Sequence, residues 1–175
     1  MDPIVVAAMA KWPNVPDCRG WLSLDRRGQW RLQGSPVRHA GLAEFIGRNY
    51  ACDETGAWFM QNGPQRVWVD LEATPWVFRL NEGALVTHTG DPAGELEAVW
   101  LVGGEALCFH TTHGFGLADD RDLAALLDYL QEPQGRFPDD LDALTLVFEW
   151  HGTSLPVHRC TEAELPTIGG FRRSP

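Results

Sequence analysis

One pattern of fourteen residues occurs twice near the start of this chain. It occupies residues 25–38 and returns at residues 53–66 in the shared form D-x-x-G-x-W-x-[LM]-Q-x-x-P-x-R. Similarity at a fixed offset indicates a duplicated structural unit, and two copies are too few for a solenoid. The repeat therefore constrains the architecture of the chain, although it carries no catalytic motif.

Each copy of the pattern predicts a β-hairpin. The Asp can bond its own backbone in the turn, and the Gly three residues later accepts the positive φ that a tight turn requires. The Trp and the Leu or Met two residues after it then share one face of the returning strand, and the Pro ends the ladder because it cannot donate a hydrogen bond. We expect two superposable hairpins in which Trp30 and Trp58 are both mostly buried.

Short strands dominate the rest of the chain, with one helix in each half. Apolar residues at helical spacing predict a helix over residues 40–50 with Leu42 on its buried face. Four leucines within residues 123–130 predict a second helix, which Asp119 or Asp120 caps. Strands are expected over residues 66–71, 76–80, 84–89, 95–102, 106–111, 144–150 and 155–160.

These elements define an α+β fold with two small β-rich subdomains, each an antiparallel sheet with one helix. The N-terminal subdomain, residues 12–71, contains the duplicated hairpin. The C-terminal subdomain, residues 72–165, carries an antiparallel sheet plus one helix. Residues 1–8 are expected to be mobile or an over-called start, and the Pro- and Gly-bearing tail is expected to be loose.

The charge balance disfavours some classes of partner. Lys and Arg number 14 against 24 Asp and Glu, so the net charge is -10. Such a surface repels phosphate backbones and anionic membranes, and we expect neither a nucleic-acid polymer nor a membrane as partner. A local basic pocket could still take a single nucleotide. The four scattered cysteines form no C-x-x-C, which favours reduced thiols in a cytoplasm.

A resemblance to known families rests on six segments of the chain. They are GWLSLD at 20–25, FIGRNY at 45–50, QNGPQR at 61–66, TPW at 74–76, HTG at 88–90 and GLADDRD at 116–122. Together they are similar to an uncharacterised proteobacterial family of unknown function, over nearly the whole chain. The R-x-G-x-W, G-x-P-x-R and x-P-aromatic pieces more distantly resemble a second uncharacterised bacterial family, which has a duplicated core and a second domain like pleckstrin-homology folds. That resemblance implies two related halves with a site between them for a nucleotide-like ligand in signalling.

A basic island is the first candidate for a site. It combines a predicted helix end, residues 48–50, with a predicted turn, residues 61–66. Arginine forks recognise carboxylate or phosphate bidentately, while amides and a phenol add hydrogen bonds and stacking. The expected ligand-binding residues are Arg48, Asn49, Tyr50, Gln61, Asn62, Gln65, Arg66, Trp68, Trp76, Arg79 and His88. The alternative is structural, with Asn49 as a left-handed helix cap, Asn62 in a turn and the arginines paired with surface acids.

Cys108, His110 and His113 form the second candidate site. A Cys and a His two residues apart on a strand share a face, but zinc would need another ligand from elsewhere. A thiolate nucleophile would need an activating helix N-terminus or an oxyanion donor, and none is evident nearby. A buried Cys with hydrogen-bonded histidines is therefore favoured, and we expect no metal and no cofactor.

The sequence thus favours a cytoplasmic, non-enzymatic regulatory or signalling module. It would bind a small polar or anionic ligand, nucleotide-like molecules included, between its two halves. The main alternative is a metal- or thiol-dependent enzyme centred on Cys108, His110 and His113. The third is a protein-interaction adaptor that uses the eight tryptophans, and a protein partner is compatible with either binding role.

Overall fold

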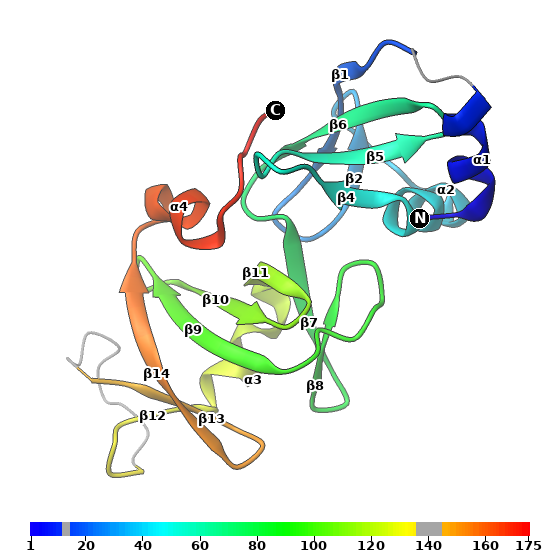
Figure 1. Cartoon of the computed structure of the whole chain (residues 1–175). Helices are drawn as coiled ribbons and strands as arrows, with labels where there is room; N and C mark the ends of the chain where they lie inside the picture. The colour runs from blue at the N-terminus through cyan, green and yellow to red at the C-terminus, as the bar shows by residue number, and fades with distance from the viewer. Residues whose placement is uncertain (12–14, 136–144) are drawn as a thin grey trace. The chain divides into compact units, whose positions relative to one another are not determined.

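The structure is a computed structural model that describes residues 1–11, 15–135 and 145–175 (Figure 1). The contacts divide the chain into two units. The first unit comprises residues 1–75 together with residues 170–175, and the second comprises residues 76–169. The chain therefore leaves the first unit after Pro75 and returns to it at Gly170.

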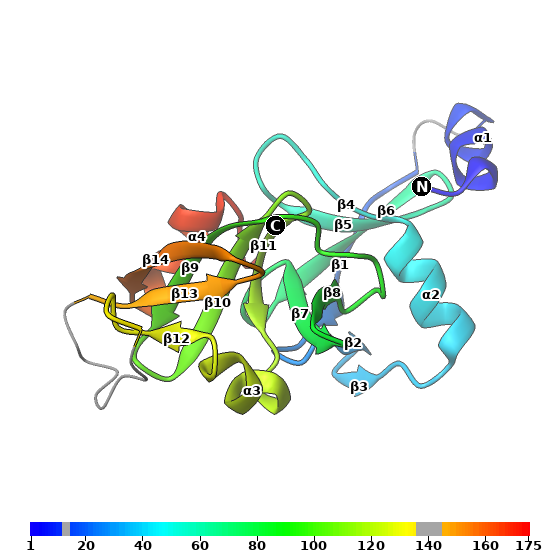
Figure 2. The same cartoon turned by 90° about the horizontal axis from the view of Figure 1, so that it is seen from below.

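The first unit is a six-stranded sheet with two helices (Figures 1 and 2). Its elements are α1 (Pro3–Lys11), β1 (Cys18–Leu24), β2 (Trp30–Leu32), β3 (Ser35–Pro36), α2 (Ala40–Arg48), β4 (Tyr50–Cys52), β5 (Trp58–Asn62) and β6 (Gln65–Leu71). The strand order is β3-β2-β1-β6-β5-β4, and only β1 and β6 pair in parallel. The sheet thus consists of two antiparallel three-stranded meanders joined along β1 and β6.

The two meanders begin with the same turn chemistry. The Asp25 and Asp53 carboxylates each accept hydrogen bonds from the amides two and four residues further on, at 2.9–3.0 Å. Both segments form the hairpins that the sequence predicts, and Trp30 is buried while Trp58 is half-buried. Tyr50 contacts both indoles, with ring centroids at 5.0 Å from Trp30 and 4.6 Å from Trp58.

The two copies diverge after the tryptophan. Gln33 lies in the tight turn between β2 and β3 with φ 48°, whereas Gln61 lies inside β5 and is fully buried. Strand β5 continues beyond the matching position, so the next turn comes at residues 63–64 rather than directly at Gln61. The prolines differ accordingly, because Pro36 pairs within β3 and Pro64 lies in the turn.

The second unit is an eight-stranded sheet with short helices. Its elements are β7 (Trp76–Asn81), β8 (Ala84–Thr87), β9 (Leu96–Val102), β10 (Ala106–Thr111), β11 (Gly114–Ala118), a 3₁₀ turn (Asp120–Asp122), α3 (Leu123–Leu127), β12 (Leu130–Gln131), β13 (Val147–Trp150), β14 (Thr153–Cys160), a second 3₁₀ turn (Glu162–Glu164) and α4 (Leu165–Gly169). The strand order is β12-β13-β14-β9-β10-β11-β7-β8. Phe78, Phe109 and Phe148 are completely buried and contact one another in series, with centroids 6.3 and 5.5 Å apart.

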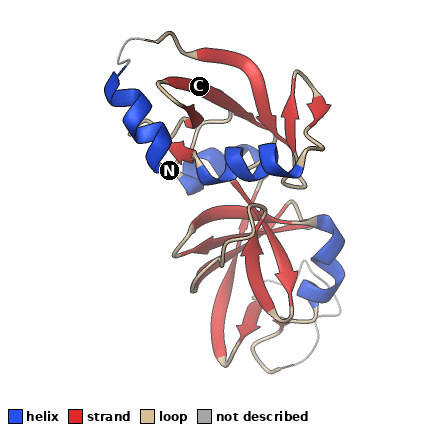
Figure 3. Cartoon of the chain, turned by 90° about the vertical axis from the view of Figure 1, so that its right-hand side faces the viewer, coloured by secondary structure: helices blue, strands red, loops and turns tan. Residues whose placement is uncertain are grey.

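The predicted α+β class is confirmed, and strands dominate both units (Figure 3). The sheets are mixed rather than purely antiparallel, since β1 pairs with β6, β9 with β14 and β7 with β11 in parallel. Each unit contains a helix beyond the one predicted for it, namely α1 and α4. Leu42, expected on the buried face of α2, is 37% exposed.

The chain ends also differ from the expectation. Residues expected to be mobile form α1, in which Val5 is buried. The tail expected to be loose is attached to the first unit, because the N–H of Arg172 donates to the carbonyl of Gly56 and the N–H of Leu71 donates to the carbonyl of Arg173. The predicted strand over residues 144–150 begins outside the described residues, and its described part forms β13.

Candidate functional site

The helix end of the predicted island holds an acidic residue of the chain itself. Asn49, which caps α2, is 1% exposed, and its Oδ1 accepts the N–H of Asp2 at 2.8 Å. Its Nδ2 donates to the Asp2 carboxylate at 3.3 Å and to the carbonyl of Phe45 at 2.9 Å. Arg48 Nε donates to the same carboxylate at 3.3 Å. Asn49 is thus a helix cap, as the structural alternative expected, but with φ −112° rather than a left-handed conformation.

Tyr50 and Gln61 lie in the interior of the first unit. The Tyr50 hydroxyl donates to the carbonyl of Pro75 at 3.1 Å, and burial raises the pKa of the phenol well above its ordinary value. Gln61 Nε2 donates to the carbonyl of Gly63 at 2.9 Å, while its buried Oε1 has no hydrogen-bond partner among the residues that the structure describes. Asn62 is exposed at the end of β5.

At the turn end of the island, two arginine guanidinium groups lie against aromatic rings. Strands β5 and β6 place Phe59 opposite Trp68, with ring centroids 5.5 Å apart. The Arg66 guanidinium lies 4.6 Å from the Phe59 ring and 5.9 Å from the Trp68 ring. Arg19, from β1, lies 4.8 Å from the same Trp68 ring. We call this set, Arg19, Phe59, Arg66 and Trp68, the arginine–tryptophan face.

Two hydrogen bonds fix the segment that carries Arg19. Trp68 Nε1 donates to the Asp17 carboxylate at 2.8 Å, and Gln65 Nε2 donates to the carbonyl of Pro16 at 2.9 Å. The register between β1 and β6 shifts in this segment. Cys18 pairs with Val67 and Leu22 with Val69, so four residues along β1 correspond to two along β6. Such a bulge re-aims side chains and is common beside functional sites. Trp21 lies within it and is 53% exposed.

Neither Arg19 nor Arg66 forms an ion pair within the described ranges 1–11, 15–135 and 145–175. Arg66 does act at longer range on Asp53. Burial alone would raise the pKa of Asp53, but hydrogen bonds from Thr55 and Ala57, with the charge of Arg66, hold it below its ordinary value.

The predicted residues of the second unit have structural partners of their own. Arg79 forms an ion pair with Asp122, whose carboxylate also accepts the N–H of Leu80 at 3.0 Å. The hydrogen bond from Arg79 is the main cause that lowers the pKa of Asp122. Trp76 is buried, with its ring centroid 5.5 Å from that of His88 and 4.4 Å from that of His113.

The residues of the enzyme alternative do not gather into a reaction centre. Cys108 is completely buried in β10, although a nucleophile must be reached by its substrate. His110 Nδ1 bonds Glu97 at 2.7 Å, and His113 packs against Trp76. Within the part of the chain that the structure describes, no group of three or more His, Cys, Asp or Glu is placed to hold a metal ion.

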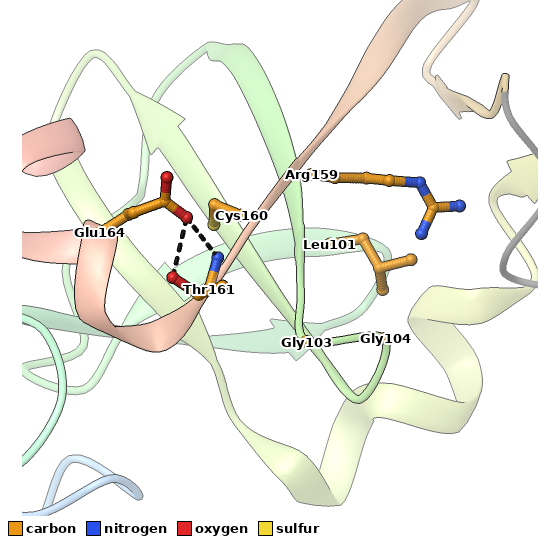
Figure 4. A pocket seen from close by; sticks show the side chains of 7 residues that line it. All are labelled: Leu101, Gly103, Gly104, Arg159, Cys160, Thr161 and Glu164. Atoms are coloured by element: carbon orange, nitrogen blue, oxygen red, sulfur yellow. Dashed lines mark hydrogen bonds between the residues drawn. The ribbon is translucent and has the colours of Figure 1, made fainter.

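A hollow of about 350 Å³ lies elsewhere in the second unit (Figure 4). It is lined by Leu101, Gly103, Gly104, Arg159, Cys160, Thr161 and Glu164. The Glu164 carboxylate is engaged, because it accepts the N–H and the hydroxyl of Thr161 at 2.7 and 2.8 Å. Arg159 points away from Glu164, and burial, followed by the charge of Glu164, raises the pKa of the Cys160 thiol. This hollow therefore offers neither an activated thiol nor a free carboxylate.

The chain is an α+β protein of two β-rich units, with the arginine–tryptophan face on the first. Residues 1–175 match the family described as "Protein of unknown function (DUF2946)", and the chain belongs to that family. The resemblance to an uncharacterised family is thereby confirmed. No curated protein matches the chain.

Two crystal structures resemble the fold. A DUF1285 family protein from Silicibacter pomeroyi DSS-3 has a TM-score of 0.56 at 16% identity, over 90% of this chain and 96% of that chain. A DUF1285 family protein from Shewanella baltica OS155 has a TM-score of 0.47 at 14% identity, over 62% of this chain and 91% of that chain. The first likeness supports the fold and carries no activity with it. No helix in the described ranges has the length and apolar character needed to cross a membrane.

Proposed function

We propose that this protein is a non-enzymatic regulatory or signalling module that binds a small anionic ligand with a flat ring, of the nucleotide type, on the arginine–tryptophan face. The observation that carries the proposal is the position of two guanidinium groups over one buried indole. Arg19 and Arg66 lie 4.8 and 5.9 Å from the Trp68 ring, and neither has an ion-pair partner in the described residues.

An anion is the favoured ligand because two neighbouring cations repel each other until a negative group lies between them. Arginine forks recognise carboxylate or phosphate through paired N–H donors, and stacking on an aromatic ring fixes the plane of the fork in advance. In a protein of net charge -10, such a pair is a local exception that attracts anions to one place.

A flat ring is favoured by the aromatic surroundings of the two arginines. Trp21, on the same strand as Arg19, is 53% exposed, and an exposed indole offers a stacking surface for a planar ligand. The guanidinium groups lie against the buried Phe59 and Trp68 rings, which gives the site aromatic walls. The ligand would therefore combine an acidic group with an aromatic or heterocyclic ring.

The proposal is confined to residues of the first unit. Of the expected ligand-binding residues, Arg66, Trp68 and Gln65 belong to the proposed site or its support, and Arg19 joins them. A cytoplasmic location, a proteobacterial family and a pleckstrin-homology-like second unit remain parts of the proposal. The burial of Cys108 counts against the thiol enzyme.

The test is a thermal-shift and calorimetry screen with nucleoside mono- and diphosphates and with inorganic phosphate. We expect a nucleotide to bind without turnover, and Arg66→Lys to weaken it about tenfold, because Lys keeps the charge and loses the fork. Arg38→Lys is the matched control, since Arg38 holds the equivalent place in the first copy of the pattern and is exposed.

Two results would overturn the proposal. One is the absence of any ligand-dependent stabilisation across the panel. The other is an Arg66→Lys variant that melts at a lower temperature but binds every ligand with unchanged affinity, which would make the face a structural stack.

A further inference from the structure

The way in which the chain holds Asp2 resembles the recognition of a ligand. Asn49 accepts the backbone N–H of Asp2 with its Oδ1 and donates to the Asp2 carboxylate with its Nδ2, at 2.8 and 3.3 Å. Arg48 adds a charged donor at 3.3 Å. One buried amide thus recognises both the main chain and the side chain of an acidic residue. The bond from Asn49 is also the main cause that lowers the pKa of the Asp2 carboxyl.

The Asp2 carboxylate faces the site rather than its own helix. An Asp that precedes a helix, with Pro at the first helical position, ordinarily accepts an amide of the first turn with its side chain. Here the carbonyl of Asp2 accepts the amides of Val5 and Val6, while the carboxylate binds Asn49 and Arg48. The acidic side chain therefore serves to attach α1 to the rest of the first unit.

Only a narrow stripe of α1 is in contact. Val5 is 3% exposed, and Ala8 lies close to Gly63 in the turn between β5 and β6. Outside the stripe, Met1, Ile4 and Val6 are 54%, 77% and 53% exposed. A helix attached by one acidic residue and a few small apolar contacts can be exchanged for another segment that offers the same groups.

A buried polar group beside this contact is left unsatisfied. Gln61 is 1% exposed, its N–H donates to the carbonyl of Asn49, and its Nε2 donates to the carbonyl of Gly63. Its Oε1 has no hydrogen-bond partner within the described residues. Most buried acceptors in proteins are hydrogen-bonded, so Gln61 Oε1 lacks a donor that such acceptors ordinarily have. The alanine of α1 near Gly63 supplies none.

We propose that Arg48, Asn49, Gln61 and Gly63 form a docking site for an acidic helical peptide of a protein partner, and that α1 occupies this site within the chain. The peptide would present an Asp before its first helical turn and a small aliphatic residue three positions later, as Asp2 and Val5 do. This site is separate from the arginine–tryptophan face and does not depend on the proposed ligand there.

The experiment uses the full chain and a fluorescent peptide with the sequence of residues 1–11. Asp2→Ala in the chain removes the anchor of its own helix, so the peptide in solution gains access to the site. We expect the Asp2→Ala chain to bind the peptide at least about tenfold more tightly than the unmodified chain, measured by fluorescence anisotropy. Glu54→Ala is the control, because Glu54 is an exposed acidic residue of the same unit that lies outside the proposed site.

Two further variants test the chemistry of recognition. A peptide with Asp2→Ala should bind the Asp2→Ala chain at least about tenfold less tightly than the unmodified peptide. Arg48→Ala in the same chain should lower the affinity as well, and since the Arg48 side chain is 54% exposed the fold should persist by circular dichroism. The proposal is overturned if the peptide binds no form of the chain, or if its affinity is the same with and without Asp2.

Discussion

The returning tail makes Gly56 a position where a single methyl group should have a large effect. Gly56 has φ +80°, and a Cβ there would collide with the carbonyl oxygen of Gly170 and lie 3.1 Å from the Cα of Phe171. Gly34 is the matched control in the same unit. It has φ +78°, and a Cβ would meet no atom within 4 Å. Both alanine variants carry the same backbone strain, and only Gly56→Ala must displace the tail.

The expected magnitude follows from what the tail contributes. The strain of a left-handed alanine costs about 1–2 kcal/mol in either variant. Displacing the tail also removes two backbone hydrogen bonds at about 1 kcal/mol each and the burial of Phe171 at about 2 kcal/mol. The entropy that the released residues regain offsets part of this loss, so Gly56→Ala should cost about 2 kcal/mol more than Gly34→Ala.

Urea unfolding followed by tryptophan fluorescence measures the difference in free energy of unfolding. Hydrogen exchange of the Leu71 and Arg172 amides reports the attachment of the tail directly. The Leu71 amide donates to a carbonyl of the tail, and the Arg172 amide belongs to the tail and donates to the carbonyl of Gly56. We expect faster exchange at both positions in Gly56→Ala alone. Equal costs for the two variants, or unchanged protection of the two amides, would refute the reasoning.

Three further outcomes are expected. The hydrogen bond from Arg79 lowers the pKa of Asp122 below its ordinary value of 3.8. The pair therefore stabilises the fold fully at a pH above 3.8, and this stabilisation is lost as the pH falls through the lowered pKa of the folded state. Asp122→Asn should therefore cost about 1–2 kcal/mol at pH 7 and progressively less in acid; an equal cost at both ends of a urea series over pH would contradict this. Cys52 should react with a thiol reagent in the native protein and Cys108 only after unfolding, because the first is exposed and the second buried; mass spectrometry of labelled peptides decides it. EDTA should leave the melting temperature unchanged, since the described residues contain no metal-ligand cluster, and a clear fall in a melting curve would contradict that expectation.

Local rules were sufficient for the turns and for most strands. The hairpin turn at Asp53 depends on hydrogen bonds within five residues, so the sequence contains all the information it needs. Strand β11 (Gly114–Ala118) escaped prediction because its run, GFGLA, has two glycines, which are depleted in strands. Its position is set by a distant strand. A Cβ on Gly116 would lie 2.6 Å from the carbonyl oxygen of Trp76, so the close parallel pairing with β7 requires glycine there.

The same contrast between local and long-range information holds for the candidate site, where residues brought in from distant segments were missed. Arg66 was identified from sequence as part of the predicted basic island, and Trp68 as a residue of the strand beside it. Arg19 was missed because the parallel pairing of β1 with β6 brings it to Trp68 across almost fifty residues. Asp2 was missed because a short apolar segment at a chain end gives no local sign that Asn49 holds it.

The first unit is built from two separate stretches of the chain, and this has a consequence for synthesis on the ribosome. All six strands of its sheet are made before the second unit, yet the carbonyl of Gly56 and the amide of Leu71 receive their partners only from residues 170–175. The first unit is thus completed by residues that are translated only after the whole of the second unit. A nascent chain arrested before Gly170 should expose the surface that Phe171 covers, and the first unit should reach its final resistance to proteases only once residues 170–175 have left the exit tunnel.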